Sequence, residues 1–170
     1  MAPLPPSAAK VQAALTGLGH DQPVVTFPDS TRSAADAASA IGCTVGQIAK
    51  SLVFRAEPDN RPVLVIAAGT NRVDEARVAA ALGDLLGGAR IVRASAEFVR
   101  MATGFAIGGV PPIGHATPPL VVIDRDLMAH ATIWAAAGTP NAVFALTPAQ
   151  LVIMTGGKVA PVAVLPAGSP

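Results

Sequence analysis

Lys50 is the first residue whose type and setting indicate chemistry. It is one of only three lysines in the chain, and short apolar segments lie on both sides of it. Thr44 and Gln47 have the spacing of a capping box, which predicts a short helix over residues 45–50. A lysine at the end of such a helix either complements the helix dipole or meets an anion in a cleft. The residues alone leave both interpretations open.

A loop rich in glycine and proline, Gly108-Gly109-Val110-Pro111-Pro112-Ile113-Gly114-His115, is the second candidate. Glycine lets the backbone come close to a ligand, and proline fixes the shape of a loop. Amide N–H groups on such a rigid turn are suited to receive a developing oxyanion. The loop lies within residues 103–119, where no regular element is expected, and irregular stretches of this length are usually functional. A plain connection between a helix and a strand is the alternative.

The familiar catalytic and metal-binding signatures are missing from the sequence. There is no phosphate-binding loop and no H-E-x-x-H, C-x-x-C or G-x-S-x-G motif. His20, His115 and His130 lack metal-ligand spacing, and we expect His115 to be a loop or core residue rather than an acid or base. Cys43 is expected to be a small buried hydrophobe. Any catalysis must therefore work without a triad, and we expect no metal and no cofactor.

Short apolar strands alternate with alanine-rich helices along the chain. Capping residues, apolar stripes at helical spacing and unbroken apolar runs carry these assignments. Helices are expected at residues 7–17, 33–41, 45–50, 74–82, 95–102 and 147–156, and strands at 24–27, 52–54, 63–67, 91–92, 120–123, 142–146 and 158–164. The pattern predicts one mixed α/β domain over residues 1–170, with 1–6 and 166–170 frayed. It is too irregular for a doubly wound nucleotide-binding fold.

Composition limits the class of protein. The chain has 170 residues, of which 51% are hydrophobic and 14% charged, and this excludes intrinsic disorder. The net charge of +1 argues against a non-specific nucleic-acid coat protein. Together with Lys50, seven of the arginines place positive charge in the first 100 residues, and they are expected to be mostly solvated: Arg55, Arg61, Arg72, Arg77, Arg90, Arg93 and Arg100.

The sequence also indicates where the protein acts. Residues 127–157 contain no Asp, Glu, Lys or Arg, but Gly138, Pro140 and Pro148 interrupt them, so we expect no membrane span. The single cysteine fits a reducing compartment, and the N-terminal residues lack the pattern of a secretory signal. We therefore expect a cytoplasmic protein.

Taken together, the two candidates resemble the YbaK/EbsC family, which includes free-standing relatives of the editing domain inserted in bacterial prolyl-tRNA synthetases. The motifs that carry the resemblance are Gln47-Ile48-Ala49-Lys50-Ser51-Leu52-Val53-Phe54, the strand near Val63, and Gly108-Gly109-x-x-Pro112-x-Gly114-His115. The resemblance extends roughly from Val24 to Val162. It implies a curled mixed sheet surrounded by helices, with a pocket between the Lys50 strand and the glycine loop.

The activity implied by this resemblance is hydrolysis of the ester that links a wrongly attached amino acid to the terminal ribose of a tRNA. The expected substrate is tRNAPro carrying Cys, Ala, Ser or Thr. Lys50 is expected to hold the terminal phosphate or carbonyl region, while Gly108 and Gly109 cradle the aminoacyl group and supply backbone donors. The attacking group comes from a ribose hydroxyl, from the amino acid's side chain, or from a water that they position. The further residues implied to bind substrate are Ser51, Val110, Pro112, Gly114, His115 and Gly138.

The expected specificity and partners depend on where the sequence departs from the family pattern and on the net charge of the chain. The segment Ala135-Ala136-Ala137-Gly138-Thr139-Pro140 replaces a more polar turn of cysteine-specific members, so cysteine specificity is not assumed. The low net charge predicts weak affinity for tRNA, which an association with prolyl-tRNA synthetase would strengthen. Two alternatives remain: a catalytically silent module that docks on tRNA or a synthetase, and a sensor of a small metabolite or free amino acid.

Overall fold

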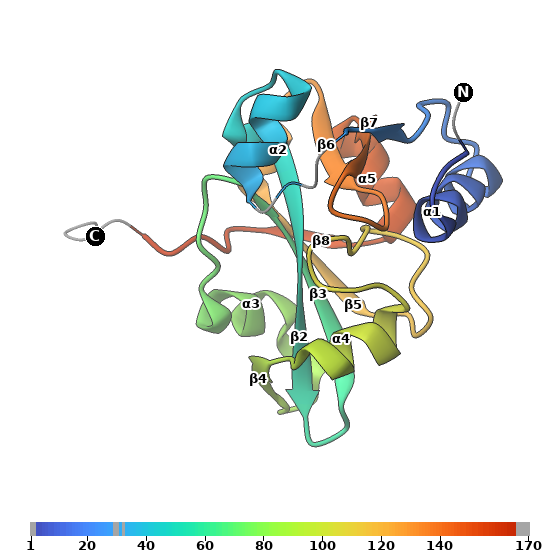
Figure 1. The fold of residues 1–170 in the computed structure, drawn as a ribbon. Helices are drawn as coiled ribbons and strands as arrows, with labels where there is room; N and C mark the ends of the chain where they lie inside the picture. Colours follow the sequence, from blue (N-terminus) through green and yellow to red (C-terminus); the bar gives the residue numbers. More distant parts are fainter. Residues whose placement is uncertain (1–2, 29–30, 32, 166–170) are drawn as a thin grey trace.

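A computed structural model describes residues 3–28, 31 and 33–165 (Figure 1). Its helices are α1 (Pro6–Gly17), α2 (Ala34–Ile41), α3 (Glu75–Leu82), α4 (Ala96–Thr103) and α5 (Pro148–Thr155), with short 3-10 helices η1 (Val45–Gln47), η2 (Gly83–Leu86) and η3 (Arg125–Ala129). Its strands are β1 (Val25–Thr26), β2 (Ile48–Glu57), β3 (Arg61–Ala68), β4 (Arg90–Arg93), β5 (Leu120–Asp124), β6 (Ile133–Ala136), β7 (Ala142–Leu146) and β8 (Lys158–Ala160). The predicted mixed α/β class, with helices around a mixed sheet, is confirmed.

All eight strands belong to one sheet. Its order is β1-β7-β6-β2-β3-β5-β8, and β4 pairs with β2 outside this path. The β2–β3, β2–β4, β6–β7 and β1–β7 pairs are antiparallel, whereas β2–β6, β3–β5 and β5–β8 are parallel. The long hairpin of β2 and β3 forms the centre of the molecule (Figure 1).

The two faces of the β2–β3 hairpin build two separate cores. Successive side chains of a strand point to opposite faces. Leu64 and Ile66 therefore join the first core, together with residues of α1, α4 and α5. Val63 and Val65 join the second, together with residues of α3. The central strand β3 is buried on both faces, as its unbroken apolar run predicts.

The prediction for residues 45–50 is wrong in one respect that matters for the site. The capping box of Thr44 and Gln47 forms, but it starts only the short helix η1, and the chain enters β2 at Ile48. Pairing with β3 from Ala49 onwards outweighs the weak tendency of this segment to continue as a helix. Lys50 is therefore a strand residue, and the helix-dipole interpretation does not apply to it.

Three elements were not expected from the sequence, β6, η2 and η3. Alanines of low strand propensity form half of β6, and the strand exists because β2 and β7 pair with it from both sides. Of the ends predicted to be frayed, residues 1–2 and 166–170 lie outside the described residues, while Leu4 packs against the first core. Within the described part of the chain, no helix is long and apolar enough to cross a membrane.

Candidate active site

One edge of β2 has a gap in its strand pairing, and this gap lies at the centre of the candidate site. On the edge of β2 away from β3, β6 pairs with Ile48 and Ala49, and β4 pairs with residues from Phe54 to Glu57. Residues 50–53 have no strand partner on this edge among the described residues. The sheet therefore presents a short stretch of open backbone within residues 50–53.

Two adjoining cavities meet at this break. The small cavity, of about 300 Å³, is bounded by α2, β6 and the turn before β7. The large cavity, of about 610 Å³, is bounded by residues 69–73, the end of β4 and α4. The residues that line both are Lys50, Ser51, Leu52, Ile107, Gly108 and Val110. The Lys50 strand and the glycine loop thus enclose a pocket between them, in the arrangement that the resemblance implies.

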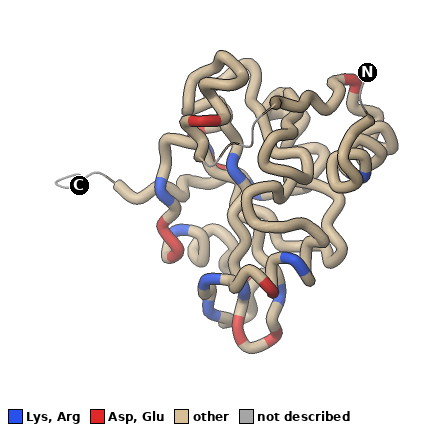
Figure 2. The backbone as a smooth tube through the Cα atoms, in the orientation of Figure 1, with Lys and Arg blue, Asp and Glu red and all other residues tan. Residues whose placement is uncertain are grey.

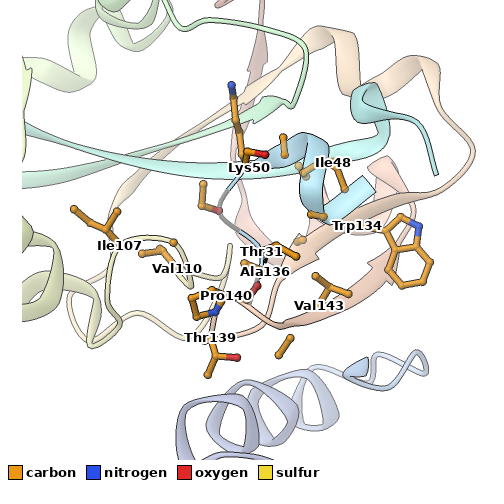
Figure 3. Close-up of a pocket in the computed structure, with 18 of the residues that line it drawn as sticks. Thr31, Ile48, Lys50, Ile107, Val110, Trp134, Ala136, Thr139, Pro140 and Val143 are labelled. Carbon is orange, nitrogen blue, oxygen red and sulfur yellow. Dashed lines mark hydrogen bonds between the residues drawn. The ribbon is translucent and has the colours of Figure 1, made fainter. Parts of the chain in front are cut away.

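Small apolar side chains form most of the small cavity (Figure 3). Alanines from α2, β2, β6 and β7 contribute to its wall, and Trp134 and Val143 are its largest members on the side of β6 and β7. Thr31, Ser33 and Thr139 add hydroxyl groups. Lys50 is the one charged residue among the described residues that line it. The cavity suits a small, uncharged group.

The large cavity is more polar and more basic. Arg72 and Arg93 line it together with Asn71 and Glu75, in addition to Lys50. Figure 2 shows that most Lys and Arg residues gather in the half of the molecule built from β2, β3, β4, α3 and α4. Several Asp and Glu residues lie in the same half (Figure 2), but the lining of this cavity carries Lys50, Arg72 and Arg93 against the single carboxylate of Glu75, so it suits an anionic ligand.

The Lys50 side chain and the Ser51 side chain leave β2 on opposite faces, because successive residues of a strand alternate. In Figure 3 the Lys50 ammonium extends away from Val110, Thr139 and Pro140. Partial burial lowers the pKa of Lys50 below its usual 10.5, and the negative charge of Asp124 opposes this shift. Lys50 makes no hydrogen bond or ion pair with any described residue. Its charge is therefore available to a ligand.

Asp124, at the end of β5, holds the wall of the large cavity in place. Its side chain is 1% exposed and accepts hydrogen bonds from the N–H of Ala68 at 3.0 Å, from Nδ2 of Asn71 at 2.8 Å and from the N–H of Asp126 at 2.9 Å. Asn71 Nδ2 also donates to Asp126 at 2.8 Å. A buried carboxylate with several donors is a rigid anchor. It fixes residues 69–73 beside Lys50.

The glycine loop is held by its own backbone. The N–H of Gly109 donates to the carbonyl of Ala106 at 3.1 Å, and its carbonyl accepts from the N–H of Gly138 at 2.9 Å. Both groups are therefore engaged within the protein, and Gly109 has no free donor for an oxyanion. Gly108, which has a φ of 95° and borders both cavities, is the glycine of this loop that faces a ligand.

His115 locks the far end of the loop. Its Nε2 bonds to the carbonyl of Pro111 at 2.6 Å, and because a carbonyl only accepts, Nε2 carries the proton. Burial lowers the pKa of His115 below its usual 6.5, which favours the neutral ring. Pro112 is buried and Gly114 is exposed. His115, Pro112, Gly114 and Gly138 line neither cavity.

Comparison with known proteins identifies this arrangement. The profile of the family described as aminoacyl-tRNA editing domain matches residues 28–153, which span the small helix α2, the break in the sheet and both cavities. The chain belongs to the aminoacyl-tRNA editing domain family. The resemblance inferred from the Lys50 and Gly108 motifs is thereby confirmed.

Individual relatives of this editing domain cover nearly its whole length. An uncharacterized protein of Bacillus subtilis (strain 168), YwhH, is 34% identical over 153 residues, which are 90% of this chain and 94% of that protein. The crystal structure of a putative trans-editing enzyme for prolyl tRNA synthetase is 44% identical with a TM-score of 0.86, covering 96% of this chain and all of that one. The hypothetical protein APE2540 is 27% identical with a TM-score of 0.80, over 91% and 99% of the two chains.

The structure brings together only part of the predicted site of this editing domain. Lys50, Ser51, Gly108 and Val110 meet around the break in the sheet. Sequence reasoning missed Asp124, although an acidic residue that ends a buried strand was a usable signal. It also treated Arg72 and Arg93 as ordinary surface residues, and the sequence contains no sign that they share a cavity.

Proposed function

We propose that this editing domain hydrolyses the ester of mischarged aminoacyl-tRNA in trans, with tRNAPro carrying a small, uncharged amino acid as its substrate. The observation that carries the proposal is the meeting of two unlike cavities at one point. A small, nearly uncharged cavity and a larger basic one share Lys50, Ser51 and Gly108. An aminoacyl-tRNA end has the same two parts, a small amino acid and an anionic nucleotide, joined at the ester.

The small cavity supports the choice of amino acid. About 300 Å³ bounded largely by apolar side chains, several of them alanines, has room for the side chains of Ala, Ser, Cys or Thr. Of the described lining residues, Lys50 alone is charged, and it extends toward the opposite face of β2, so nothing there pairs with a charged side chain. The match to a trans-editing enzyme named for prolyl tRNA synthetase supports tRNAPro and an association with that synthetase.

The large cavity supports the placement of the nucleotide. Lys50, Arg72 and Arg93 bring three positive charges to it, and Glu75 brings one negative charge. Ile107, whose side chain is 61% exposed at the border of both cavities, offers an apolar surface to a base. We assign Lys50 to the terminal phosphate and the ester, with Arg72 and Arg93 beside the preceding backbone.

The reaction adds water across the ester. The water oxygen bonds to the carbonyl carbon, the bond between that carbon and the ribose oxygen breaks, and the ribose oxygen takes up a proton. Ser51 follows Lys50 in sequence but lies on the opposite face of β2, so Lys50 does not activate its hydroxyl as a nucleophile. In this proposal a hydroxyl of the substrate orients the water, and backbone donors with the Lys50 charge stabilise the oxyanion.

A deacylation assay tests the proposal. tRNAPro charged with Cys, Ala, Ser, Thr or Pro is incubated with wild type, Lys50→Ala and Lys50→Arg. We expect rapid loss of one or two of the non-cognate esters, sparing of Pro-tRNA, and a loss of about 100-fold or more in Lys50→Ala. Lys50→Arg, which keeps the charge, should retain part of the activity. If no ester is cleaved while tRNA still binds, the protein is a silent binding module and the proposal fails.

A further inference from the structure

The open backbone beside β2 belongs chiefly to Ser51. The carbonyl of Ile48 accepts a hydrogen bond from the N–H of Gly69, which follows β3, at 2.8 Å. Within a strand, the N–H and C=O of one residue point to the same side and those of the next residue to the other. Ile48, Lys50 and Leu52 therefore direct these groups to β3. Ser51 directs its N–H and C=O to the edge where no strand pairs with it.

The Ser51 hydroxyl is a third polar group at the same place. Its Oγ is buried and has no hydrogen-bond partner among residues 3–28, 31 and 33–165. Ser51 lies on the face of β2 that carries Ala49 and Val53, which belong to the first core or pack against it. Ser51 also lines both cavities. Buried polar groups in proteins are nearly always bonded, so the unbonded Ser51 hydroxyl, beside a backbone N–H and C=O that have no strand partner, indicates a missing ligand.

We infer that Ser51 docks the aminoacyl group as a one-residue antiparallel strand, an inference that rests on the proposed function. Its N–H donates to the ester carbonyl, and its C=O accepts from the α-ammonium group. These two bonds are the ones that residues exchange in a hydrogen-bonded antiparallel pair. The side chains of such a pair lie on the same face, so the Ser51 hydroxyl faces the side chain of the bound amino acid.

This docking supplies the oxyanion donor that the glycine loop lacks at Gly109, whose N–H is already bonded to Ala106. The hydrogen bond from the Ser51 N–H strengthens as negative charge develops on the carbonyl oxygen during attack. The bond from the α-ammonium to the Ser51 carbonyl is charge-assisted and selects for a free amino acid terminus. Ser51 is thus a catalytic residue through its main chain and a specificity residue through its side chain.

Proline at this position provides a direct test. Ser51→Pro removes the N–H, and because this N–H has no partner in the sheet, the strand keeps its bonds to β3. We expect a folded protein, by circular dichroism and thermal unfolding, with kcat lowered about 100- to 1000-fold. Ser51→Ala keeps the N–H, so it should lose far less on alanyl-tRNA and shift the preference away from Ser and Thr. Wild-type kcat in a folded Ser51→Pro variant would overturn the inference.

A substrate analogue tests the second bond without any mutation. Propionyl-tRNAPro lacks only the amino group of alanyl-tRNAPro, and we expect its kcat/KM to be about 10- to 100-fold lower. Equal rates for the two esters would overturn the docking mode while leaving the proposed deacylase intact. Absence of turnover with every ester of the panel would instead overturn the proposed function.

A binding measurement separates these cases further. The probe is 3′-alanylamino-3′-deoxyadenosine, whose amide is not hydrolysed, added to ¹⁵N-labelled wild type. We expect the Ser51 amide proton to move downfield and its exchange with solvent to slow, because it enters a hydrogen bond. If the resonances of Gly108 and Val110 shift while that of Ser51 does not, the ligand occupies the pocket without docking on β2, and the inference is wrong.

Discussion

Gly109 and Gly138 lie backbone against backbone, and the N–H of Gly138 donates to the carbonyl of Gly109 at 2.9 Å. A Cβ atom added to Gly109 would be 2.8 Å from the carbonyl carbon and oxygen of Gly138. One added to Gly138 would be 2.6 Å from the carbonyl oxygen of Ser7. The glycine loop, the turn before β7 and α1 are therefore packed without room for any side chain, and this packing sets the position of Gly108.

Gly109→Ala should displace the loop from its turn. We expect a loss of about 1–3 kcal/mol in the free energy of unfolding, since rigid backbone must move, together with a marked fall in deacylation. Urea unfolding and kcat/KM measure the two effects. Gly17→Ala is the control, because a Cβ there meets nothing within 4 Å, and it should leave activity unchanged. Equal behaviour of the two variants would contradict this account of the loop.

The charge on Lys50 should set an upper pH limit on activity. Because partial burial lowers the pKa of Lys50 below 10.5, its positive charge is lost earlier than in an ordinary lysine as pH rises. The enzyme-dependent rate, corrected for spontaneous ester hydrolysis, should decrease as the pH rises through the pKa of Lys50. Lys50→Arg should abolish this fall, since arginine keeps its charge in this range. An identical alkaline limb in both proteins would exclude Lys50 as its source.

Asn71→Ala removes one of the donors to the buried Asp124 carboxylate. We expect a loss of about 1–2 kcal/mol in the free energy of unfolding and a higher KM, because residues 69–73 form a wall of the large cavity. Thr70→Ala is the stability control, since Thr70 is exposed and makes only a weak contact of 3.5 Å with Asn71. Chemical denaturation and steady-state kinetics are the measurements. A loss in Thr70→Ala as large as in Asn71→Ala would argue against the Asp124 anchor.

Protonation of His115 should weaken the fold in mild acid. Burial lowers the pKa of His115 below 6.5 in the folded chain, so the unfolded chain binds a proton more readily. The contribution of neutral His115 to the free energy of unfolding should therefore be fully present above pH 6.5. It should decline as the pH falls from there through the folded-state pKa. In His115→Gln this part of the pH dependence should vanish. Unfolding curves of wild type and His115→Gln recorded at several pH values test this prediction. Parallel pH profiles of the two proteins would show that His115 is not the source of the loss of stability.

Arg72 and Arg93 should contribute to tRNA binding through phosphate charge. Each substitution to Gln should lower the slope of log Kd against log salt by about 0.7, the value for one contact with a single strand. Fluorescence anisotropy with tRNAPro at several salt concentrations measures it. Arg125→Gln is the matched control, because Arg125 is exposed on η3 and lines neither cavity. If the slope decreased in Arg125→Gln and stayed unchanged in Arg72→Gln, the tRNA would bind outside the large cavity.

Local signals predicted most of the elements and long-range pairing decided the rest. Ser33, Ser95 and Thr147 begin their helices with the side-chain caps that their types predict. The segment after Gln47 became a strand because β3 pairs with it, and β6 exists through its neighbours, neither of which a local pattern reveals. The motifs around Lys50 and Gly108 led to the right family. The break beside Ser51 was beyond reach, because it depends on where two distant strands stop.

The gap in strand pairing along β2 is also limited in length. On this edge of β2, pairing with β6 ends at Ala49 and pairing with β4 begins at Phe54, so strands close both ends of the open edge. In the proposed docking mode, an α-amino group already joined to another residue brings no positive charge to the Ser51 carbonyl. We therefore expect the domain to spare peptidyl-tRNA, which the ribosome needs intact, and N-acetylalanyl-tRNA to resist hydrolysis in the same way.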